Sequence, residues 1–475
     1  SKVEDLSQEF YNLGHLCEAA VAHYRATGKR TLLDVTIRYA DCVCREVGDN
    51  EGQACVVPGH QIAEMGLAKL YTVTGEKRYL DMAKFFLDKR GYTTIKTEYS
   101  QSHKPVLEQD EAVGHAVRAG YMYAGMADVA AMTGDTTLVP ALNAIWHDIV
   151  DKKMHITGGL GAVPGIEGFG PDYVLPNKNT YDETCAAVGN VFFNYRMFLM
   201  SGDAKYIDVA EVALYNNVLA GVNLAGNRFF YVNPLEADGR KAFNHGTAGR
   251  AQWFGTACCP SNLARLIPQV SGMAYSYAED NIFCGFYIGS KVNVPMAGGD
   301  VTLVQQTEYP FSGDVAIEVN PSVDGEEFTL WLRIPTWCGE QFVPGELYKY
   351  DDNEQPKVVA RVNGRKVRGE AVNGFLPIHR AWKGGDKVEL ELPMPVRFNV
   401  ADERVEADRN RVCVTRGPLV YCAEEEDNEQ QVSTYFVSNA KPQASVGKFS
   451  EGVMNGIYTI SMPADVAFAE QDTKS

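Results

Sequence analysis

Two short segments of the chain carry the residue types best suited to chemistry. One is Glu183-Thr184-Cys185, and the other is the adjacent pair Cys258-Cys259. One carboxylate and three thiols form the kind of ligand set that holds zinc in a tetrahedral site. Their spacing differs from the paired C-x2-C of a zinc ribbon, so the motif alone is weak. Free cysteine is also among the most buried residue types, so a purely structural role has about equal support.

Both segments are expected at the start of a helix. Pro260 follows the cysteine pair, and proline is favoured in the first helical turn, so the pair should lie at or just before a helix N-terminus. Thr184 is a suitable cap for a helix over residues 185–200. A helix N-terminus or a bound metal lowers the pKa of a thiol, so two such helix starts could share one ion.

A glycine-rich run supplies another candidate. Residues 158–171 contain six glycines, and Glu167 is the sole acid among them. Such glycine density excludes a regular helix and lets the backbone approach a ligand closely. The Gly-x-Gly-x-x-Gly spacing of a nucleotide-binding loop is missing. Glu167 is therefore a candidate acid/base group, with a solvent-exposed loop carboxylate as the alternative.

The elements that would position these residues are helical hairpins. Apolar residues recur at three- and four-residue spacing through the region 1–278. One turn signature recurs four times between amphipathic segments, and its glycine suits a helix C-cap. Four hairpins with one turn form an internal repeat. The four turns are Ala26-Thr27-Gly28-Lys29, Val73-Thr74-Gly75-Glu76, Met132-Thr133-Gly134-Asp135 and Met200-Ser201-Gly202-Asp203.

Three histidines recur at the other end of these hairpins. His15, His60 and His115 each follow a glycine and are expected to open the first helix of a pair. Hairpins arranged in a ring would bring these helix starts to one rim, where they would meet Glu183 and Cys185. Any single histidine is more often a structural residue, but three at equivalent positions favour a shared site.

The region 279–475 is predicted to be β-structure. Short alternating segments separated by turns are typical of β-sandwich domains, here as two jelly-roll-like modules. Asn363-Gly364 is a strong hairpin turn signal. The acidic run 424–429 is expected to be a solvated loop, and no low-complexity linker separates the two regions, so close docking is expected. The predicted strands are 283–288, 301–307, 315–319, 328–334, 358–367, 387–392 and 411–414.

Composition sets further bounds. A chain of 475 residues should hold two or three domains. Its net charge of −17 argues against nucleic acid or an anionic membrane surface as a partner, and no apolar stretch is long enough to span a bilayer. Eleven cysteines are too few for a disulfide scaffold. Residues 1–5 lack the features of a signal peptide, which leaves the compartment open between bacterial cytoplasm and periplasm.

Taken together, the hairpins, the thiol set and the loop glutamate resemble glycoside hydrolase family 127, the bacterial β-L-arabinofuranosidases, and the related family 146. The most specific parts are residues 183–186, Glu-Thr-Cys-Ala, and 258–262, Cys-Cys-Pro-Ser-Asn. The resemblance covers nearly the whole chain and implies an (α/α)6 barrel followed by antiparallel β-sandwich domains. Family members generally carry a longer segment ahead of the histidine matching His15. The early barrel helices are therefore expected to be missing from this sequence.

The resemblance also implies roles for individual residues. It implies a retaining glycosidase that releases L-arabinofuranose, or a related furanose, from plant glycans. Cys258 would be the nucleophile and Glu167 the acid/base. Zn²⁺ would be held by Glu183, Cys185, Cys258 and Cys259. The sugar hydroxyls would contact His15, His60, His115 and Tyr231.

The chemistry of such a site can be stated as an expectation. The thiolate would attack the anomeric carbon while Glu167 protonates the departing oxygen, and water would then hydrolyse the thioglycoside. Zinc would stabilise the thiolate as a leaving group. The anionic surroundings are expected to raise the pKa of Glu167. Neutral histidines could both donate and accept hydrogen bonds to a furanose.

Two other functions stay open on the sequence alone. One is a non-catalytic carbohydrate-binding protein with a structural zinc site. The other is a different (α/α)6-type activity, such as a uronyl hydrolase, lyase or sugar epimerase, which needs no thiol set. In each case the partner is a carbohydrate, from a plant cell-wall glycan or a glycoprotein, and a homodimer is allowed.

Overall fold

The computed structural model describes residues 7–437, 444–452 and 456–467. Residues 1–5, on which the expectation about a signal peptide rests, lie outside this description, as do parts of the region 279–475. Within the described residues, no helix combines the length and apolar character needed to cross a bilayer.

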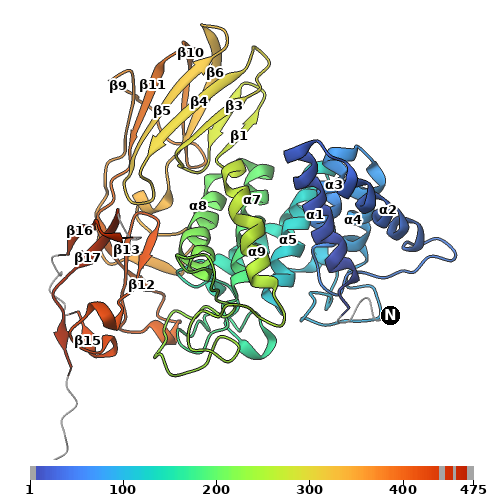
Figure 1. Ribbon diagram of the computed structural model, residues 1–475, viewed down its shortest axis with the longest axis horizontal. Coiled ribbons are helices and arrows are strands. Elements are labelled where there is room, and N and C mark those ends of the chain that lie inside the picture. Colours follow the sequence, from blue (N-terminus) through green and yellow to red (C-terminus); the bar gives the residue numbers. More distant parts are fainter. Residues whose placement is uncertain (1–6, 438–443, 453–455, 468–475) are drawn as a thin grey trace, which may run out of the picture.

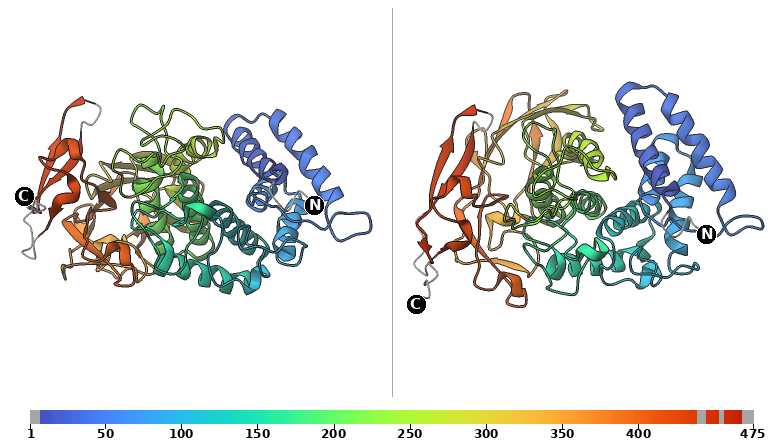
Figure 2. Two further views of the ribbon diagram at one scale, coloured as in Figure 1. Left: turned by 90° about the horizontal axis from the view of Figure 1, so that it is seen from below. Right: turned by 60° about the horizontal axis from the view of Figure 1, so that its bottom comes forward.

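The first half of the chain is a two-layered array of helices (Figure 1). The odd-numbered helices α1, α3, α5, α7 and α9 pack against one another in sequence, and each even-numbered helix packs on its hairpin partner. Figure 2 shows the helices following an arc from α1 and α2 round to α9. The nine α-helices of the described residues are α1 (Glu9–Thr27), α2 (Thr31–Glu46), α3 (Ala63–Thr74), α4 (Lys77–Lys89), α5 (Ala116–Thr133), α6 (Val139–Asp148), α7 (Thr184–Ser201), α8 (Ala204–Ala213) and α9 (Cys258–Leu266).

The recurring turn signature forms the four helix ends that the sequence predicts. Gly28, Gly75, Gly134 and Gly202 each follow a helix with φ between 68° and 73°, the left-handed conformation that glycine adopts without steric cost. The hydroxyl group of the preceding Thr or Ser also stabilises the turn. It donates to the carbonyl four residues earlier and accepts the N–H two residues later, in all four turns. The motif therefore ends one helix and starts the next.

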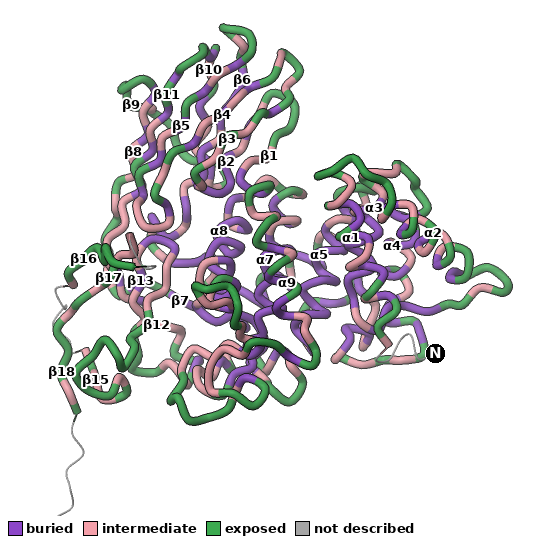
Figure 3. The backbone as a smooth tube through the Cα atoms, in the orientation of Figure 1, coloured by how far each residue is buried: buried purple, intermediate pink, exposed green. Residues whose placement is uncertain are grey.

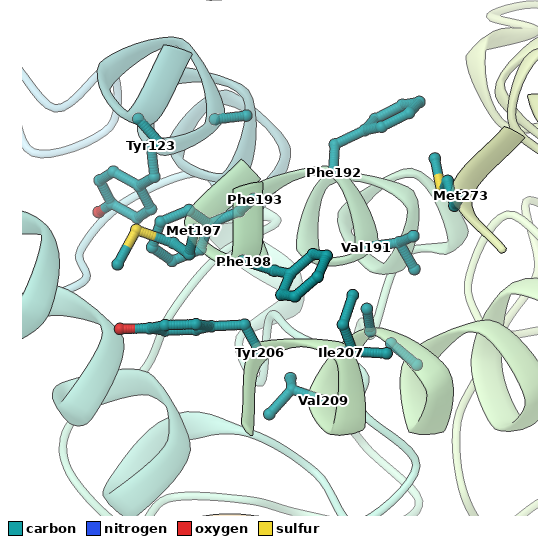
Figure 4. Close-up of a cluster of buried hydrophobic side chains, with 14 of the residues drawn as sticks. Tyr123, Val191, Phe192, Phe193, Met197, Phe198, Tyr206, Ile207, Val209 and Met273 are labelled. Carbon is teal, nitrogen blue, oxygen red and sulfur yellow. The ribbon is translucent and has the colours of Figure 1, made fainter. Parts of the chain in front are cut away.

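The inner helices approach closely because they meet at glycines. A Cβ on Gly14 would lie 2.6 Å from the carbonyl carbon of Ile62, and a Cβ on Gly66 would lie 2.6 Å from the carbonyl oxygen of Gly14. Most residues of α5 and α7 are buried, and the exposed ones lie mainly at the helix C-termini (Figure 3). Figure 4 shows the aromatic and aliphatic side chains of α7 interleaved with those of α8. A helix that is apolar all round must be covered on all sides, which fixes the inner layer.

The second half is β-rich, and its first strand follows directly on the short helical segment that ends at Met273. The strand orders are β1-β2-β6-β10, β3-β4-β5-β11-β8-β9 and β14-β13-β12-β7, with β15 pairing β18 and β16 pairing β17. The strands are β1 (Tyr275–Ala278), β2 (Asn281–Cys284), β3 (Ser290–Val294), β4 (Val301–Thr307), β5 (Asp314–Pro321), β6 (Glu326–Arg333), β7 (Tyr348–Tyr350), β8 (Val359–Val362), β9 (Arg365–Lys366), β10 (Phe375–Trp382), β11 (Asp386–Glu391), β12 (Val396–Ala401), β13 (Cys413–Arg416), β14 (Leu419–Tyr421), β15 (Tyr435–Phe436), β16 (Ser445–Phe449), β17 (Ile457–Ser461) and β18 (Asp465–Val466).

Most of the predicted strands are confirmed, and the exceptions have physical reasons. The hairpin at Asn363-Gly364 forms as expected between β8 and β9. The predicted strand 283–288 ends at Cys284, because its later apolar residues are buried in a turn held by the carbonyl of Ala274. The sequence missed β10, which contains Pro377 and lies at the edge of its sheet, where a proline is tolerated.

A buried charge cluster joins the two halves. Arg333 of β6 is fully buried and donates to Asp208 and Glu211 of α8. Tyr309 Oη donates to the same Glu211 at 2.7 Å. Since α8 is the hairpin partner of α7, this contact fixes the β-rich half against the helix whose N-cap is Glu183. The expected close docking is confirmed.

Candidate metal and sugar-binding site

The structure brings the four predicted ligands together. One side-chain atom from each of Glu183, Cys185, Cys258 and Cys259 lies within 4.8 Å of the others. The Sγ atoms of Cys185 and Cys259 are 3.1 Å apart, and Glu183 Oε1 lies 3.4 Å from Cys259 Sγ and 3.6 Å from Cys258 Sγ. These atoms come from the starts of two inner helices, α7 and α9, which pack side by side.

Local structure explains why these residues point at one another. Cys258 is the first residue of α9 and Pro260 lies in its first turn, as the sequence predicts. The expectation that Thr184 caps α7 is wrong, because Glu183 occupies the N-cap position. The Thr184 hydroxyl donates instead to the carbonyl of Phe230, and its N–H to that of Tyr231. This pairing leaves the Glu183 side chain free to face the thiols.

The charges of the cluster favour a cation. Burial raises the pKa of the Glu183 carboxyl well above its usual range, and the charges of Cys258 and Glu167 add to this. Hydrogen bonds from Cys185 and Cys259 lower the pKa of Cys258, whereas burial raises the pKa of those two thiols. Among the described residues, the buried Glu183 Oε2 has no hydrogen-bond partner. A carboxylate and soft sulfur donors around an unsatisfied oxygen fit a metal ion.

Glu167 lies beside this cluster on the glycine-rich loop. Its Oε2 is 3.1 Å from His115 Nε2, and its Oε1 accepts a hydrogen bond from Tyr181 Oη at 2.9 Å. A second group of atoms within 4.8 Å of one another joins Glu167, His115 and Glu183. The expected rise in the pKa of Glu167 is wrong. The hydrogen bond with His115 lowers that pKa, with Tyr181 acting in the same direction, against burial and the charge of Cys258.

The glycines around Glu167 serve contacts within the protein. A Cβ on Gly168 would lie 1.9 Å from the carbonyl oxygen of Gly114, and a Cβ on Gly114 would lie 1.9 Å from that of Glu98. The loop can therefore lie directly on the start of α5. Glu167 itself has φ 52°, a left-handed conformation that is uncommon for a residue with a Cβ.

The three predicted histidines do converge, although two of them are not at helix starts. His115 is the N-cap of α5, as predicted. His15 lies inside α1, and His60 precedes the start of α3 at Ala63. The ring of Tyr11 lies 4.3 Å from that of His15 and 4.4 Å from that of His60, and the rings of His60 and His115 are 5.7 Å apart. The histidines are nevertheless gathered into one cluster.

The electrostatics of these histidines match the expectation that they are neutral. Burial lowers the pKa of all three, to about 3 for His15. Tyr231 Oη lies 3.1 Å from Cys258 Sγ. His115 and Tyr231 thus adjoin Glu167 and Cys258, and ring contacts through Tyr11 link His15 and His60 to this group.

Sequence reasoning missed several residues of this site. Asn262 donates to Cys185 Sγ at 3.1 Å and accepts from Tyr121 Oη at 2.9 Å. Asn262 lies one helical turn after Cys258, and this spacing could have indicated that both side chains lie on the same face of the helix. Tyr11 stands one turn before His15 in the same way. Tyr181, which holds Glu167, lies in irregular structure and carries no such signal.

Comparison with known proteins identifies the family. Three family models match consecutive parts of the chain: the GH127 catalytic domain of β-L-arabinofuranosidases over residues 2–272, the GH127 middle domain over 281–394, and the family 127 C-terminal domain over 396–462. The chain belongs to glycoside hydrolase family 127. It is therefore a glycoside-hydrolysing enzyme.

Individual relatives of this family 127 enzyme support the same family assignment. It is 34% identical to a non-reducing end β-L-arabinofuranosidase of Bifidobacterium longum subsp. longum, over 98% of this chain and 72% of that protein. The solved structure of a GH127 β-arabinofuranosidase matches with a TM-score of 0.93 and 51% identity, covering 98% of this chain and 72% of the other. A GH127 β-L-arabinofuranosidase from Geobacillus stearothermophilus T6 matches with a TM-score of 0.91 and 37% identity, covering 100% and 75%.

Proposed function

We propose that this family 127 enzyme is a retaining β-L-arabinofuranosidase. It would release L-arabinofuranose, or a related furanose, from the non-reducing ends of plant glycans, with Cys258 as nucleophile and Glu167 as acid/base. The observation that carries this proposal is the difference between the thiols. Cys185 and Cys259 are fully buried, whereas Cys258 is partly exposed, has a lowered pKa and shares Glu183 as a neighbour with Glu167.

Glu183, Cys185, Cys258 and Cys259 would hold a zinc ion. The unsatisfied Glu183 Oε2 and the three converging sulfurs support this assignment. When bound, zinc would keep the cysteines as thiolates and make the Cys258 thiolate a better leaving group.

The protein residues would act in two steps. In the first, Cys258 Sγ bonds to the anomeric carbon, the bond to the leaving group breaks, and Glu167 gives its proton to the departing oxygen. In the second, Glu167 takes a proton from water, the water oxygen bonds to the anomeric carbon, and the carbon–sulfur bond breaks. Since His115 and Tyr181 lower the pKa of Glu167, the first step draws on its protonated fraction.

The neutral histidines would hold the sugar. An uncharged imidazole offers one donor and one acceptor, which suits hydroxyl groups that can play either part. His15, His60 and His115 surround the space beside Cys258, and Tyr231 would add a hydroxyl near the nucleophile. His115 is buried and His15 and His60 are partly buried, which would limit the access of water to the reacting sugar.

The finer architecture is part of the same proposal. The two layers of hairpins, with odd-numbered helices inside, support an (α/α)6-type arrangement for the region 1–278. The region 279–475 would form two sandwich modules. One would be built around the sheet that contains β6, and the other around the sheet that contains β12.

Turnover of a fluorogenic β-L-arabinofuranoside tests the proposal. Cys258→Ala should abolish turnover, and Glu167→Gln should reduce it by about 10²–10⁴-fold, the usual contribution of general acid–base catalysis. Cys42→Ala, which removes an exposed thiol on α2, is the control and should leave turnover intact.

A second measurement locates the nucleophile. A thiol-directed arabinofuranosyl analogue should add one sugar to Cys258, found by mass spectrometry of the digested protein. Turnover that survives Cys258→Ala would refute the mechanism. An intact parent protein that binds but never hydrolyses the glycoside would favour a carbohydrate-binding role instead.

A further inference from the structure

A rim loop beside the candidate site is held in place by one buried asparagine. Asn244 Oδ1 accepts the N–H groups of Tyr231 and Val232, at 2.8 and 3.3 Å. Its Nδ2 donates to the carbonyls of Phe229 and Gly249, at 3.1 and 2.9 Å. A single fully buried side chain therefore ties the loop to the segment that carries Tyr231.

The residue after this anchor is in an uncommon conformation. His245 has φ 47°, in the left-handed region that residues with a Cβ rarely occupy. Its ring lies 4.3 Å from the ring of Tyr231 and 5.8 Å from that of Phe254. His245 is nonetheless exposed, and within the described part of the chain its imidazole makes no hydrogen bond. An exposed imidazole fixed against two aromatic rings can offer its ring nitrogens to a ligand.

The position of His245 indicates which part of a substrate it would meet. His15, His60 and His115 form one cluster of rings with Tyr11, and His115 contacts Glu167. The ring centroid of Tyr231 lies 6.2 Å from that of Tyr181, the tyrosine that donates a hydrogen bond to Glu167. The exposed His245 packs on the same Tyr231 ring. Since Glu167 would protonate the leaving-group oxygen, the leaving group would lie near Tyr181 and Tyr231, whose ring His245 contacts.

We propose that His245, backed by Phe254 and fixed by Asn244, forms a binding subsite for the leaving group. Its ligand is a neutral, hydroxyl-rich unit, such as the next sugar of an oligosaccharide. The imidazole would hydrogen-bond a hydroxyl while the aromatic faces pack against the sugar ring. This inference rests on the proposed arabinofuranosidase activity, because the leaving group is defined by that reaction.

Glycine substitution tests the subsite without straining the fold. His245→Gly removes the imidazole and fits the positive φ, so the melting temperature should stay the same or rise. Glu279→Gly is the matched control, since Glu279 is also exposed with a positive φ, at the turn between β1 and β2. His245→Asn keeps a hydrogen-bonding group that tolerates this conformation and should retain part of the effect.

The two substrates to compare are methyl β-L-arabinofuranoside and a disaccharide with β-L-arabinofuranose at its non-reducing end. For His245→Gly, kcat/KM on the disaccharide should fall about tenfold, the effect of one lost hydrogen bond plus ring contact, mainly through KM. The methyl glycoside should change less than about twofold, because it does not reach the rim. Glu279→Gly should change neither.

Each outcome is decisive. Equal kinetics of His245→Gly and parent on the disaccharide would overturn the subsite while leaving the arabinofuranosidase proposal intact. An equal loss on both substrates, with a lower melting temperature, would make His245 a structural residue and also overturn it. A parent enzyme that hydrolyses neither substrate would overturn the proposed function and the subsite together.

Discussion

Removing Asn262 should weaken metal binding without removing a ligand. Its side-chain amide donates to Cys185 Sγ at 3.1 Å and is almost fully buried, so no water can replace it. A hydrogen bond to a charged group contributes about 1.5–3 kcal/mol, and about 1.4 kcal/mol corresponds to a factor of ten. Asn262→Ala should therefore lower zinc affinity by about 10–100-fold. This range is typical of residues that hydrogen-bond to a metal ligand without binding the metal themselves.

A buried asparagine in the neighbouring helix provides the control. Asn194 of α7 accepts a hydrogen bond from Trp146 Nε1 at 2.8 Å and donates to Asn190, away from the thiols. Asn194→Ala should cost comparable stability but leave zinc affinity unchanged. Competition with a chromophoric chelator gives both affinities, and thermal unfolding of the metal-free proteins gives both stabilities. Equal zinc affinity in Asn262→Ala and parent, or an equal loss in Asn194→Ala, would refute the reasoning.

Two further predictions concern the scaffold. Gly14→Ala should destabilise the protein by about 1–3 kcal/mol, because its Cβ would meet backbone of Ile62, whereas Gly272→Ala, which has open space around it, should be neutral in thermal unfolding. Arg333→Ala should cost about 3–5 kcal/mol, because it leaves the two buried carboxylates of α8 unpaired, whereas Arg361→Ala removes an exposed ion pair and should cost about 0–1 kcal/mol. Equal effects of either variant and its control on the unfolding midpoint would contradict these assignments.

Features of the fold that depend on only a few adjacent residues were predicted correctly from the sequence. The turn with Gly28 and its three repeats needs only a residue that tolerates positive φ. The start of α9 at Cys258 follows from Pro260, and β4 follows from the apolar and β-branched residues over 301–307. The convergence of distant thiols was inferred from residue types, which is a weaker basis, and the structure supports it.

Features that depend on tertiary contacts were predicted poorly. His15 was placed at a helix start, although α1 begins at Glu9 and continues through it. The pKa of Glu167 was expected to rise because only nearby negative charges were considered. The hydrogen bonds from His115 and Tyr181 act in the opposite direction, and their partners come from separate segments. A single sequence contains no local signal for such pairs.

The anionic groups of the site share one structural origin. His115 caps α5, Glu183 caps α7 and Cys258 begins α9, so the N-termini of three successive inner helices meet at one place. A helix N-terminus carries partial positive charge and free N–H groups, which stabilise a thiolate or a carboxylate. The helix arrangement therefore offsets part of the repulsion among Glu167, Glu183 and Cys258. The same hairpin repeat that builds the inner layer would thus also favour the thiolate form of Cys258 that the proposed mechanism requires.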